Sequence, residues 1–384
     1  MSTNTSMQGK VSFAETLGGL FDLLSSREKD VLTRRHGLVN GSKRKETLEK
    51  IGQDYKVTRE RVRQIERDGI KKLKEKASGS GAGVALDDVE KAINQFLKKY
   101  GGVMEESHLI DSLIDFFGVS NQGLSDDDLD NHKKSLAFII TNLLSDKFEK
   151  MEGNENYHPS WKLKESPWEL VEDVIDKLVQ LIETNGKPVT ADELFKSLKG
   201  QGFYNDFQEK FAKLLEMEKE LVDLDEAILA YLRTSKKIKK NLFNNVGLSH
   251  WKTISPKRMN DKIYLVMKES GKPLHFNEIA ELINKAGFDH KKALPATIHN
   301  ELILDDRYVL IGRGIYALKE WGYQPGTVVD VISDLIKQSG PMTKDEIIES
   351  VSKQRMVKKA TVNLALMNKD KFVKTADKKY DIKK

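Results

Sequence analysis

The stretch from Thr47 to Lys74 constrains this chain more than any other. It reads TLEKIGQDYKVTRERVRQIERDGIKKLK. The pattern predicts two helices, from Leu48 to about Tyr55 and from Thr58 to Lys74, joined by a tight turn at Lys56–Val57. Apolar residues recur at the spacing with which two short helices share one seam: Leu48, Ile51, Val57, Val62, Ile65 and Ile70. We therefore expect a helix-turn-helix.

Three residues around the turn support this interpretation. We expect Gly52 to lie where the two helices approach most closely, and Thr58 to cap the second helix. Lys56 stands where many helix-turn-helix turns have glycine, so it must adopt a positive φ at some cost in strain.

The face of the second helix opposite the seam is polar and mostly basic. It carries Arg59, Glu60, Arg63, Gln64, Arg67 and Lys71. Such side chains can bind base edges or phosphates in a major groove. The alternative is an ordinary solvated face with ion pairs one helical turn apart. The two-helix spacing and Gln64 among the arginines favour DNA binding.

The same residues resemble a known family. Together with LSSREKDVLTRRHGL ahead of them, they are similar to region 4 of the housekeeping-type bacterial RNA polymerase sigma factors, over about residues 22–76. The resemblance implies that the second helix reads the −35 element of double-stranded promoter DNA, and that core RNA polymerase is a partner through the flap of its β subunit. By position, Arg59, Glu60 and Gln64 would read bases, and Thr58, Arg61, Arg63, Arg67 and Lys71 would contact phosphates or the groove wall.

Charge is concentrated in the same region. Residues 24–76 contain 17 Lys and Arg against nine Asp and Glu, whereas the rest of the 384-residue chain is nearly balanced. The chain has no cysteine and no apolar run of the roughly 20 residues that a membrane span needs. We therefore expect an intracellular protein with no membrane partner and two to four domains. The resemblance to sigma factors implies that it is bacterial, cytoplasmic and nucleoid-associated.

Beyond the helix-turn-helix the sequence repeats itself four times. Each copy has a helix, a turn of Gly followed by apolar residues, two more helices and a two-stranded end, which is the winged-helix plan. The turns begin at Gly101, Gly186, Gly271 and Gly340, and the closing strands are expected at Trp161–Leu163, Trp251–Thr253, Tyr316–Leu318 and Tyr380–Ile382.

The fold class that follows is mainly α: a sigma region 4 helix-turn-helix domain followed by tandem winged-helix domains with small β-hairpins. We expect a disordered N-terminus at 1–21, although Phe13–Leu24 could form a short helix weakened by Gly18 and Gly19. The predicted domains are the helix-turn-helix at 22–76, a flexible linker at 77–83, and winged helices at 84–165, 166–256, 257–323 and 324–384.

The third copy carries a second resemblance. Lys272-Pro-Leu-His275, Pro295 with Thr297-Ile298, and Gly312-Arg-Gly-Ile-Tyr-Ala-Leu318 resemble the HARE-type winged helix over about 258–322. That module occurs in the δ subunit of some bacterial RNA polymerases, in restriction systems and in chromatin proteins. The δ subunit continues into an acidic tail, whereas this sequence ends with basic residues. We expect the winged helices to serve as scaffold or protein contacts rather than to bind DNA. Three copies nevertheless carry basic residues that could contact DNA: Lys236, Lys237, Lys239 and Lys240 in the second, His290, Lys291, Lys292 and Arg313 in the third, and Lys353, Arg355, Lys358 and Lys359 near the third helix of the fourth.

No motif indicates an enzyme, a cofactor or a metal site. The eight histidines never form H-E-x-x-H, and no glycine-rich phosphate loop is present. The sigma factors also melt the −10 element with a separate domain, which residues ahead of 22 could not hold. We therefore expect a transcription factor of sigma type that acts with bacterial RNA polymerase but lacks the −10-melting domain. The alternatives are a polymerase-independent DNA-binding repressor or defence-system recognition protein, and an interaction protein that blocks the β flap. Activation or repression, the promoter set and the oligomeric state stay open.

Overall fold

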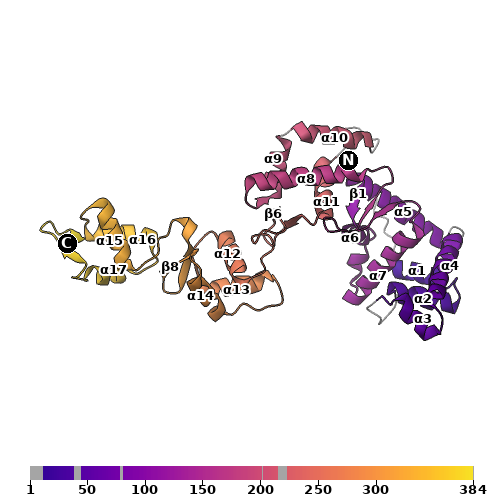
Figure 1. The fold of residues 1–384 in the computed structure, drawn as a ribbon, viewed down its shortest axis with the longest axis horizontal. Helices are drawn as coiled ribbons and strands as arrows, with labels where there is room; N and C mark the ends of the chain where they lie inside the picture. Colours follow the sequence, from indigo (N-terminus) through magenta and orange to yellow (C-terminus); the bar gives the residue numbers. More distant parts are fainter. Residues whose placement is uncertain (1–11, 39–44, 78–80, 201, 215–222, 384) are drawn as a thin grey trace. The chain divides into compact units, whose positions relative to one another are not determined.

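The computed structural model describes residues 12–38, 45–77, 81–200, 202–214 and 223–383. The chain is mainly helical, with small antiparallel sheets (Figure 1). Its contacts divide it into two compact units, Met1–Lys239 and Lys240–Lys384, and the division falls inside strand β5 (Ile238–Lys240). Each unit is described by itself.

The first unit begins with four helices. They are α1 (Phe13–Phe21), α2 (Ser26–His36), α3 (Leu48–Tyr55) and α4 (Arg59–Ala77). Ser25 and Glu28 form a capping box at the start of α2, and Gly37 ends that helix with φ 68°. The two helices predicted from the sequence are therefore present; α4 starts one residue later than expected and ends three residues later.

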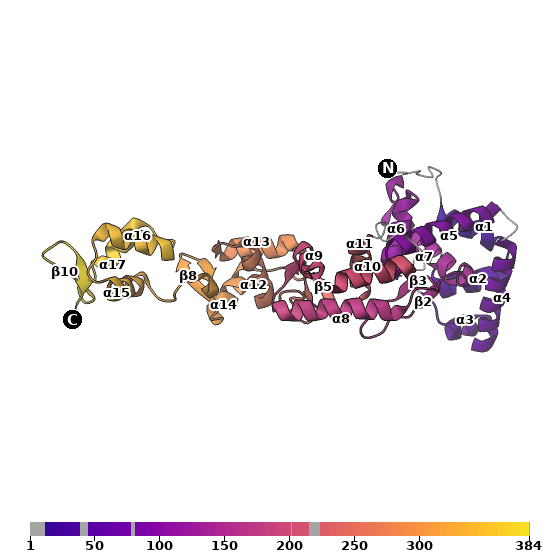
Figure 2. The same ribbon diagram turned by 90° about the horizontal axis from the view of Figure 1, so that it is seen from above.

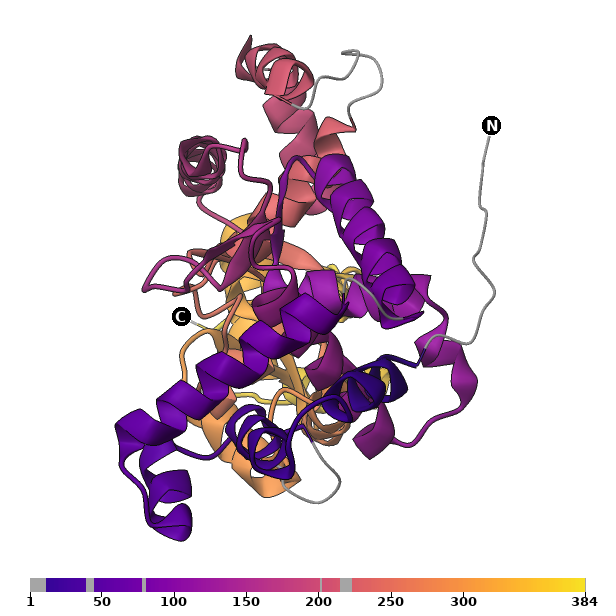
Figure 3. The same ribbon diagram turned by 90° about the vertical axis from the view of Figure 1, so that its right-hand side faces the viewer.

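Helix α1 corrects the prediction of a disordered N-terminus over 1–21. Phe13, Leu17, Leu20 and Phe21 are buried on one side of α1, which packs against α4, α5 and α7 (Figures 2 and 3). The two glycines at 18 and 19 face open space. Burial of four large side chains therefore outweighs the low helix propensity of glycine. Residues 1–11 lie outside the described part of the chain.

The first repeat follows α4 directly. Its helices are α5 (Gly81–Lys99), α6 (Glu106–Phe116) and α7 (Asp126–Phe138), with short helical turns η1 (Val119–Gln122) and η2 (Ile139–Leu143). Strands β1 (Val103–Glu105), β2 (Glu149–Met151) and β3 (Ser160–Lys162) form an antiparallel sheet in the order β1-β3-β2. Trp161 pairs with Met104 on one side and Lys150 on the other, and its side chain is buried.

One hydrophobic core joins the helix-turn-helix region to the first repeat. Leu32 and Leu73 belong to the same buried cluster as Leu97, Leu113 and Ile139 of the repeat. The linker predicted at 77–83 is wrong at both ends, because Ala77 is the buried last residue of α4 and Gly81 already begins α5. Residues 78–80 lie outside the described part. The apolar residues near this segment form the contact between the two regions, so the segment is not a boundary between separate cores.

The second repeat has an additional helix. It contains α8 (Trp168–Asn185), β4 (Val189–Thr190), α9 (Ala191–Lys199), α10 (Gly202–Leu214), α11 (Leu224–Thr234), β5 and β6 (Asn245–Leu248). Helix α10 was not expected; it forms because Phe207 and Phe211 bury one of its faces. The closing strand predicted at Trp251–Thr253 is wrong: strand β6 ends at Leu248, and Trp251 lies in the turn that follows.

The second unit contains two further repeats of the expected order. The third has α12 (Met259–Ser270), β7 (Leu274–His275), α13 (Phe276–Ala286), α14 (Pro295–Leu304), β8 (Tyr308–Gly312), β9 (Ile315–Leu318) and the short turn η4 (Lys319–Trp321), with sheet order β7-β9-β8. The fourth has α15 (Val328–Ser339), α16 (Lys344–Gln354), α17 (Lys359–Leu366), β10 (Phe372–Lys374) and β11 (Tyr380–Ile382). Met342 bridges to Tyr380 in the place of a third strand.

The third and fourth repeats have separate cores and one polar junction. Ile263 and Ile298 belong to the third core, and Ile332 and Val351 to the fourth. The buried Arg355 donates from Nη2 to the carbonyl oxygens of Gln324 (2.7 Å) and Gly326 (2.8 Å), and from Nη1 to that of Leu310. The predicted fold class is confirmed. The domain boundaries beyond residue 83 and the HARE-type assignment stay predictions.

Candidate nucleic-acid interface

Helices α3 and α4 pack as the sequence predicts. Val31 of α2, Leu48 and Ile51 of α3, and Val62 and Ile65 of α4 form a buried cluster, with Val57 packed against it. The sixth predicted seam residue, Ile70, packs against the larger core shared with the first repeat. The seam therefore fixes the first half of α4 against α3, and the second half of α4 is fixed to the rest of the unit.

The turn between α3 and α4 has the strained geometry expected of a lysine in this place. Lys56 has φ 54° and ψ 41°, in the left-handed region. A Cβ atom added to Gly52 would lie 2.7 Å from the carbonyl oxygen of Val57, so only glycine permits this close approach. The hydroxyl of Thr58 accepts a hydrogen bond from the backbone N–H of Arg61 (3.2 Å), which confirms its predicted role as the cap of α4.

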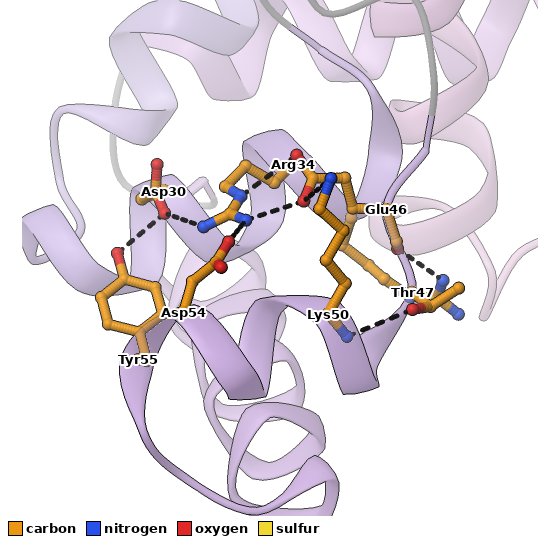
Figure 4. Close-up of polar contacts among 8 residues, drawn as sticks. Asp30, Arg34, Glu46, Thr47, Lys50, Asp54 and Tyr55 are labelled. Carbon is orange, nitrogen blue, oxygen red and sulfur yellow. Dashed lines mark hydrogen bonds and ion pairs between the residues drawn. The ribbon is translucent and has the colours of Figure 1, made fainter.

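A charged network around Arg34 fixes α3 to α2 (Figure 4). The guanidinium of Arg34 donates from Nε to Oε1 of Glu46 (3.2 Å) and from Nη2 to Oε2 of the same residue (2.7 Å). It also donates to Asp54 at the end of α3, and its Nη1 lies 3.6 Å from a carboxylate oxygen of Asp30. Tyr55 donates its hydroxyl to Asp30 (2.7 Å). Hydrogen bonds to Glu46 and Asp54 raise the pKa of Arg34 above its ordinary value.

A second set of contacts fixes α4 to α2. Glu66 of α4 lies 3.5 Å from Nε of Arg35 and 3.2 Å from Nε2 of His36. Lys72 of α4 donates to the buried carboxylate of Glu28, and the hydroxyl of Ser25 donates to it as well (2.6 Å). These hydrogen bonds, that of Lys72 first, lower the pKa of Glu28 to about 2. Both ends of α3 and the middle of α4 are thus fixed before any ligand binds.

The predicted base-reading residues lie on the free face of α4. Val62, Ile65, Gly69 and Leu73 are buried against the core. Arg59, Glu60, Arg63, Arg67 and Lys71 are exposed and Gln64 is half-exposed, at spacings of three and four residues that place them along one helix face. The side chain of Arg59 has no hydrogen-bond or ion-pair partner among the described residues.

Two hydrogen-bonded pairs of side chains, Glu60 with Arg63 and Arg61 with Gln64, determine which donors on this face remain free. Arg63 donates to both carboxylate oxygens of Glu60, from Nε (2.8 Å) and Nη2 (2.6 Å). This fork lowers the pKa of Glu60 and raises that of Arg63. Arg61 donates from Nη1 to Oε1 of Gln64 (3.1 Å), so the amide nitrogen of Gln64 stays available as a donor.

The remaining predicted contacts are loosely paired or lie elsewhere on α4. Arg67 is 4.0 Å from Asp68, and Lys71 is 3.9 Å from Glu75, distances at which exposed pairs contribute little. Arg61 lines an open cleft of about 500 Å³ between α2 and α4, together with Glu28 and Lys72. The structure therefore places Thr58 at the start of α4 and the other predicted residues along one face of the helix as far as Lys71. Arg61 lies at the edge of that face, and Lys71 lines the same cleft.

Sequence reasoning missed the residues that position α3. Arg34, Glu46 and Asp54 are separated by 12 and 20 residues, and no helical period connects them. The charged types at these positions gave no signal by themselves, because such residues are common on exposed helices.

Two further findings concern only the described part of the chain. None of the helices there is both long and apolar enough to cross a membrane. Across those same ranges, no group of histidine and carboxylate side chains is arranged to hold a metal ion.

Comparison with known proteins places a family match on this site. Residues 20–75 match the family model for Sigma-70, region 4. The RNA polymerase sigma factor SigA of Microcystis aeruginosa is 53% identical over 60 residues, which is 16% of this chain and 14% of that protein. The SigA protein of Lactococcus lactis subsp. cremoris is 48% identical over 65 residues, 17% of each chain. The chain therefore spans about one sixth of the length of these curated relatives. No solved structure matches it significantly.

Proposed function

We propose that this chain is a DNA-binding transcription factor of sigma type that acts with bacterial RNA polymerase. Helix α4 binds a −35-like promoter element, and the same region contacts the flap of the β subunit. The observation that carries the proposal is the overlap of two findings. The region 4 match covers residues 20–75, and the free face of α4 within it presents Arg59, Gln64 and Arg67 to solvent.

Different residues of α4 would contact the bases and the phosphates. Arg59 has an unpaired guanidinium that can donate to guanine O6 and N7, and Gln64 keeps its amide donors. The fork between Glu60 and Arg63 orients both side chains along the helix. Arg67 and Lys71, about two and three turns beyond Arg59 along α4, suit phosphates of the flanking backbone. Catalysis has no part in this function, and no cofactor is required.

Binding to short DNA duplexes tests the proposal. We expect Arg59→Ala or Gln64→Ala to weaken binding to a −35-like duplex by about 1–3 kcal/mol and to leave binding to a scrambled duplex nearly unchanged. Lys71→Ala should weaken both duplexes alike and lower the salt dependence of log Kd by about one unit. Lys91→Ala, an exposed lysine of α5, serves as the control. Equal loss on both duplexes for Arg59→Ala would contradict base reading by α4.

A further inference from the structure

The third helix of a winged helix is the element that can enter a DNA groove, and in the first two repeats it is covered. Helix α7 of the first repeat packs against α1. Helix α11 of the second repeat packs against β1, and the hydroxyl of Tyr231 donates to the carbonyl oxygen of Gly101 (2.6 Å). A Cβ atom at Gly101 would lie 2.9 Å from that of Ala227. Both helices are therefore occupied by contacts within the first unit.

The third repeat has an exposed third helix without positive charge. From Leu294 to Leu304 the sequence contains no lysine or arginine. The exposed side chains of α14 include Ile303 and Leu304, the latter 82% exposed. Outside α14, Lys262 is held by Asp289 (2.6 Å). The exposed Lys291, Lys292 and Arg313 have no salt bridge within the described ranges, but none of them lies on α14. This helix has nothing with which to neutralise a phosphate backbone.

The fourth repeat differs, because exposed lysines without a salt bridge gather around its closing hairpin. We call the following residues the C-terminal lysine cluster: Lys358, Lys359, Lys369, Lys371, Lys374, Lys378, Lys379 and Lys383. All eight are exposed, and none has a salt bridge within the described ranges of the chain. Three carboxylates lie among them in the sequence, those of Asp370, Asp377 and Asp381. Two more, Asp330 and Glu346, interact electrostatically with Lys371 and Lys379. Eight lysines against these five carboxylates leave the cluster with a net positive charge.

Most of the cluster lies on one hairpin. Strands β10 and β11 pair antiparallel, with Lys374 opposite Tyr380. The backbone N–H of Lys383 donates to the carbonyl oxygen of Lys371 (2.9 Å), which places these two lysines beside each other just beyond the open end of the hairpin. The turn is closed by the N–H of Thr375, which donates to the carbonyl oxygen of Lys379 (2.8 Å). Lys358 and Lys359 lie at the start of α17, in the same repeat.

The chemistry of this surface suits phosphates and not bases. Lysine is a compact point charge, whereas bidentate recognition of guanine is best made by arginine. The fourth repeat has one arginine, Arg355, which is buried and engaged with backbone carbonyls. Leu364 of α17 and Met367 at its C-terminal cap are 70% and 73% exposed, where base-reading side chains would be needed.

We propose that the fourth repeat binds the phosphate backbone of double-stranded DNA through the C-terminal lysine cluster, without reading its sequence. This revises the expectation that the winged helices serve only as scaffold or protein contacts. The chain then has two DNA contacts of different kinds, one through α4 and one through the β10–β11 hairpin. Because both belong to one chain, the second contact raises the affinity of the whole protein for any duplex.

The test uses the full chain and a random-sequence duplex. Lys369, Lys371, Lys374 and Lys379 are changed together to Gln, and Kd is measured over a series of salt concentrations. We expect affinity at low salt to fall about 10- to 100-fold, and the slope of log Kd against log salt to fall by roughly two to four. The matched control changes Lys98, Lys187, Lys196 and Lys213 to Gln, exposed lysines of the first unit with the same total charge change. It should keep the parent slope.

A second variant separates charge from folding. The change of the same four lysines to Arg keeps the positive charge and should bind the random duplex as the parent does. Parent-like salt dependence in the Gln variant would overturn the proposal, and so would equal losses in the Gln variant and its control. Binding to vesicles of anionic phospholipid is measured for the same proteins. If the Gln variant lost vesicle binding but kept the DNA binding of the parent, the cluster would be assigned to a membrane surface instead. Failure of base reading by α4 would leave this result unaffected, because the duplex here has no specific site.

Discussion

At the scale of single residues, a few close contacts fix the positions of α3 and α4 in the absence of DNA. The Val57 carbonyl allows no Cβ at Gly52, and the buried carboxylate of Glu28 is held by Lys72 and Ser25. Neither Gly52 nor Glu28 lies on the free face of α4 from which side chains could reach DNA bases. Changes at these positions therefore test the support of the site separately from its chemistry.

We expect Gly52→Ala to destabilise the first unit by about 1–3 kcal/mol, because the added Cβ forces α3 and α4 apart at the turn. Binding to a −35-like duplex should weaken with it. The control is Gly19→Ala in α1, where nothing lies within 4 Å of the added atom and the change should stabilise by about 0.5–1 kcal/mol. Chemical denaturation of both variants measures the difference. Equal stability of the two would show that the close approach at Gly52 is not required.

Glu28 gives the first unit a defined response to acid. Its pKa is lowered from 4.5 to about 2 in the folded protein, so its stabilising contribution is complete above pH 4.5 and is lost as the pH falls towards 2. Glu28→Gln keeps the capping geometry but removes the charge, and should cost about 1 kcal/mol near pH 7 because Lys72 is half-exposed. Free energies of unfolding measured from pH 7 to pH 2 should differ between parent and variant at the high end and converge at the low end. A constant difference over this range would contradict the assignment.

At the scale of elements, helix α1 joins the helix-turn-helix to the first repeat. The sequence suggested a short helix here but gave no reason to expect it to be buried, because the two glycines lower its propensity. In the structure α1 contacts α4, α5 and α7, so the region 4 match is part of a larger core. A helix that covers α7 also explains why the first repeat has no free third helix.

Leu20→Ala tests the role of α1. Leu20 is fully buried, so its truncation should cost about 2–5 kcal/mol and lower the hydrogen-exchange protection of α4 and α7 together. Leu23→Ala, at a side chain 38% exposed just after α1, should cost less than 1 kcal/mol. If Leu20→Ala loosened α1 alone and left α4 as protected as in the parent, the shared core would not stabilise the reading helix.

At the scale of the whole molecule, the sequence predicted local features better than long-range ones. The seam from Leu48 to Ile65, the cap at Thr58 and the tight approach at Gly52 follow from periodicity and turn chemistry, and all three are present. The order of helices in the repeats was also predictable, apart from α10. The strands were predicted less well: the strand at Trp251 is absent, and β1, β4 and β7 add a third strand where only a two-stranded end was expected. The continuous core across 77–83 and the network of Arg34 were not predictable, because both depend on contacts between residues far apart in the chain.

The central claim is that this chain works on bacterial RNA polymerase at promoters. The most direct test is affinity purification of the tagged full chain from its native host at moderate salt, with nuclease added to remove bridging DNA. The control is the same purification with Gly52→Ala, which should retain less of any partner that binds through the helix-turn-helix. We predict stoichiometric β and β′ subunits in the eluate of the parent. Their absence, with the tagged protein folded, would contradict the claim and favour a polymerase-independent DNA-binding repressor.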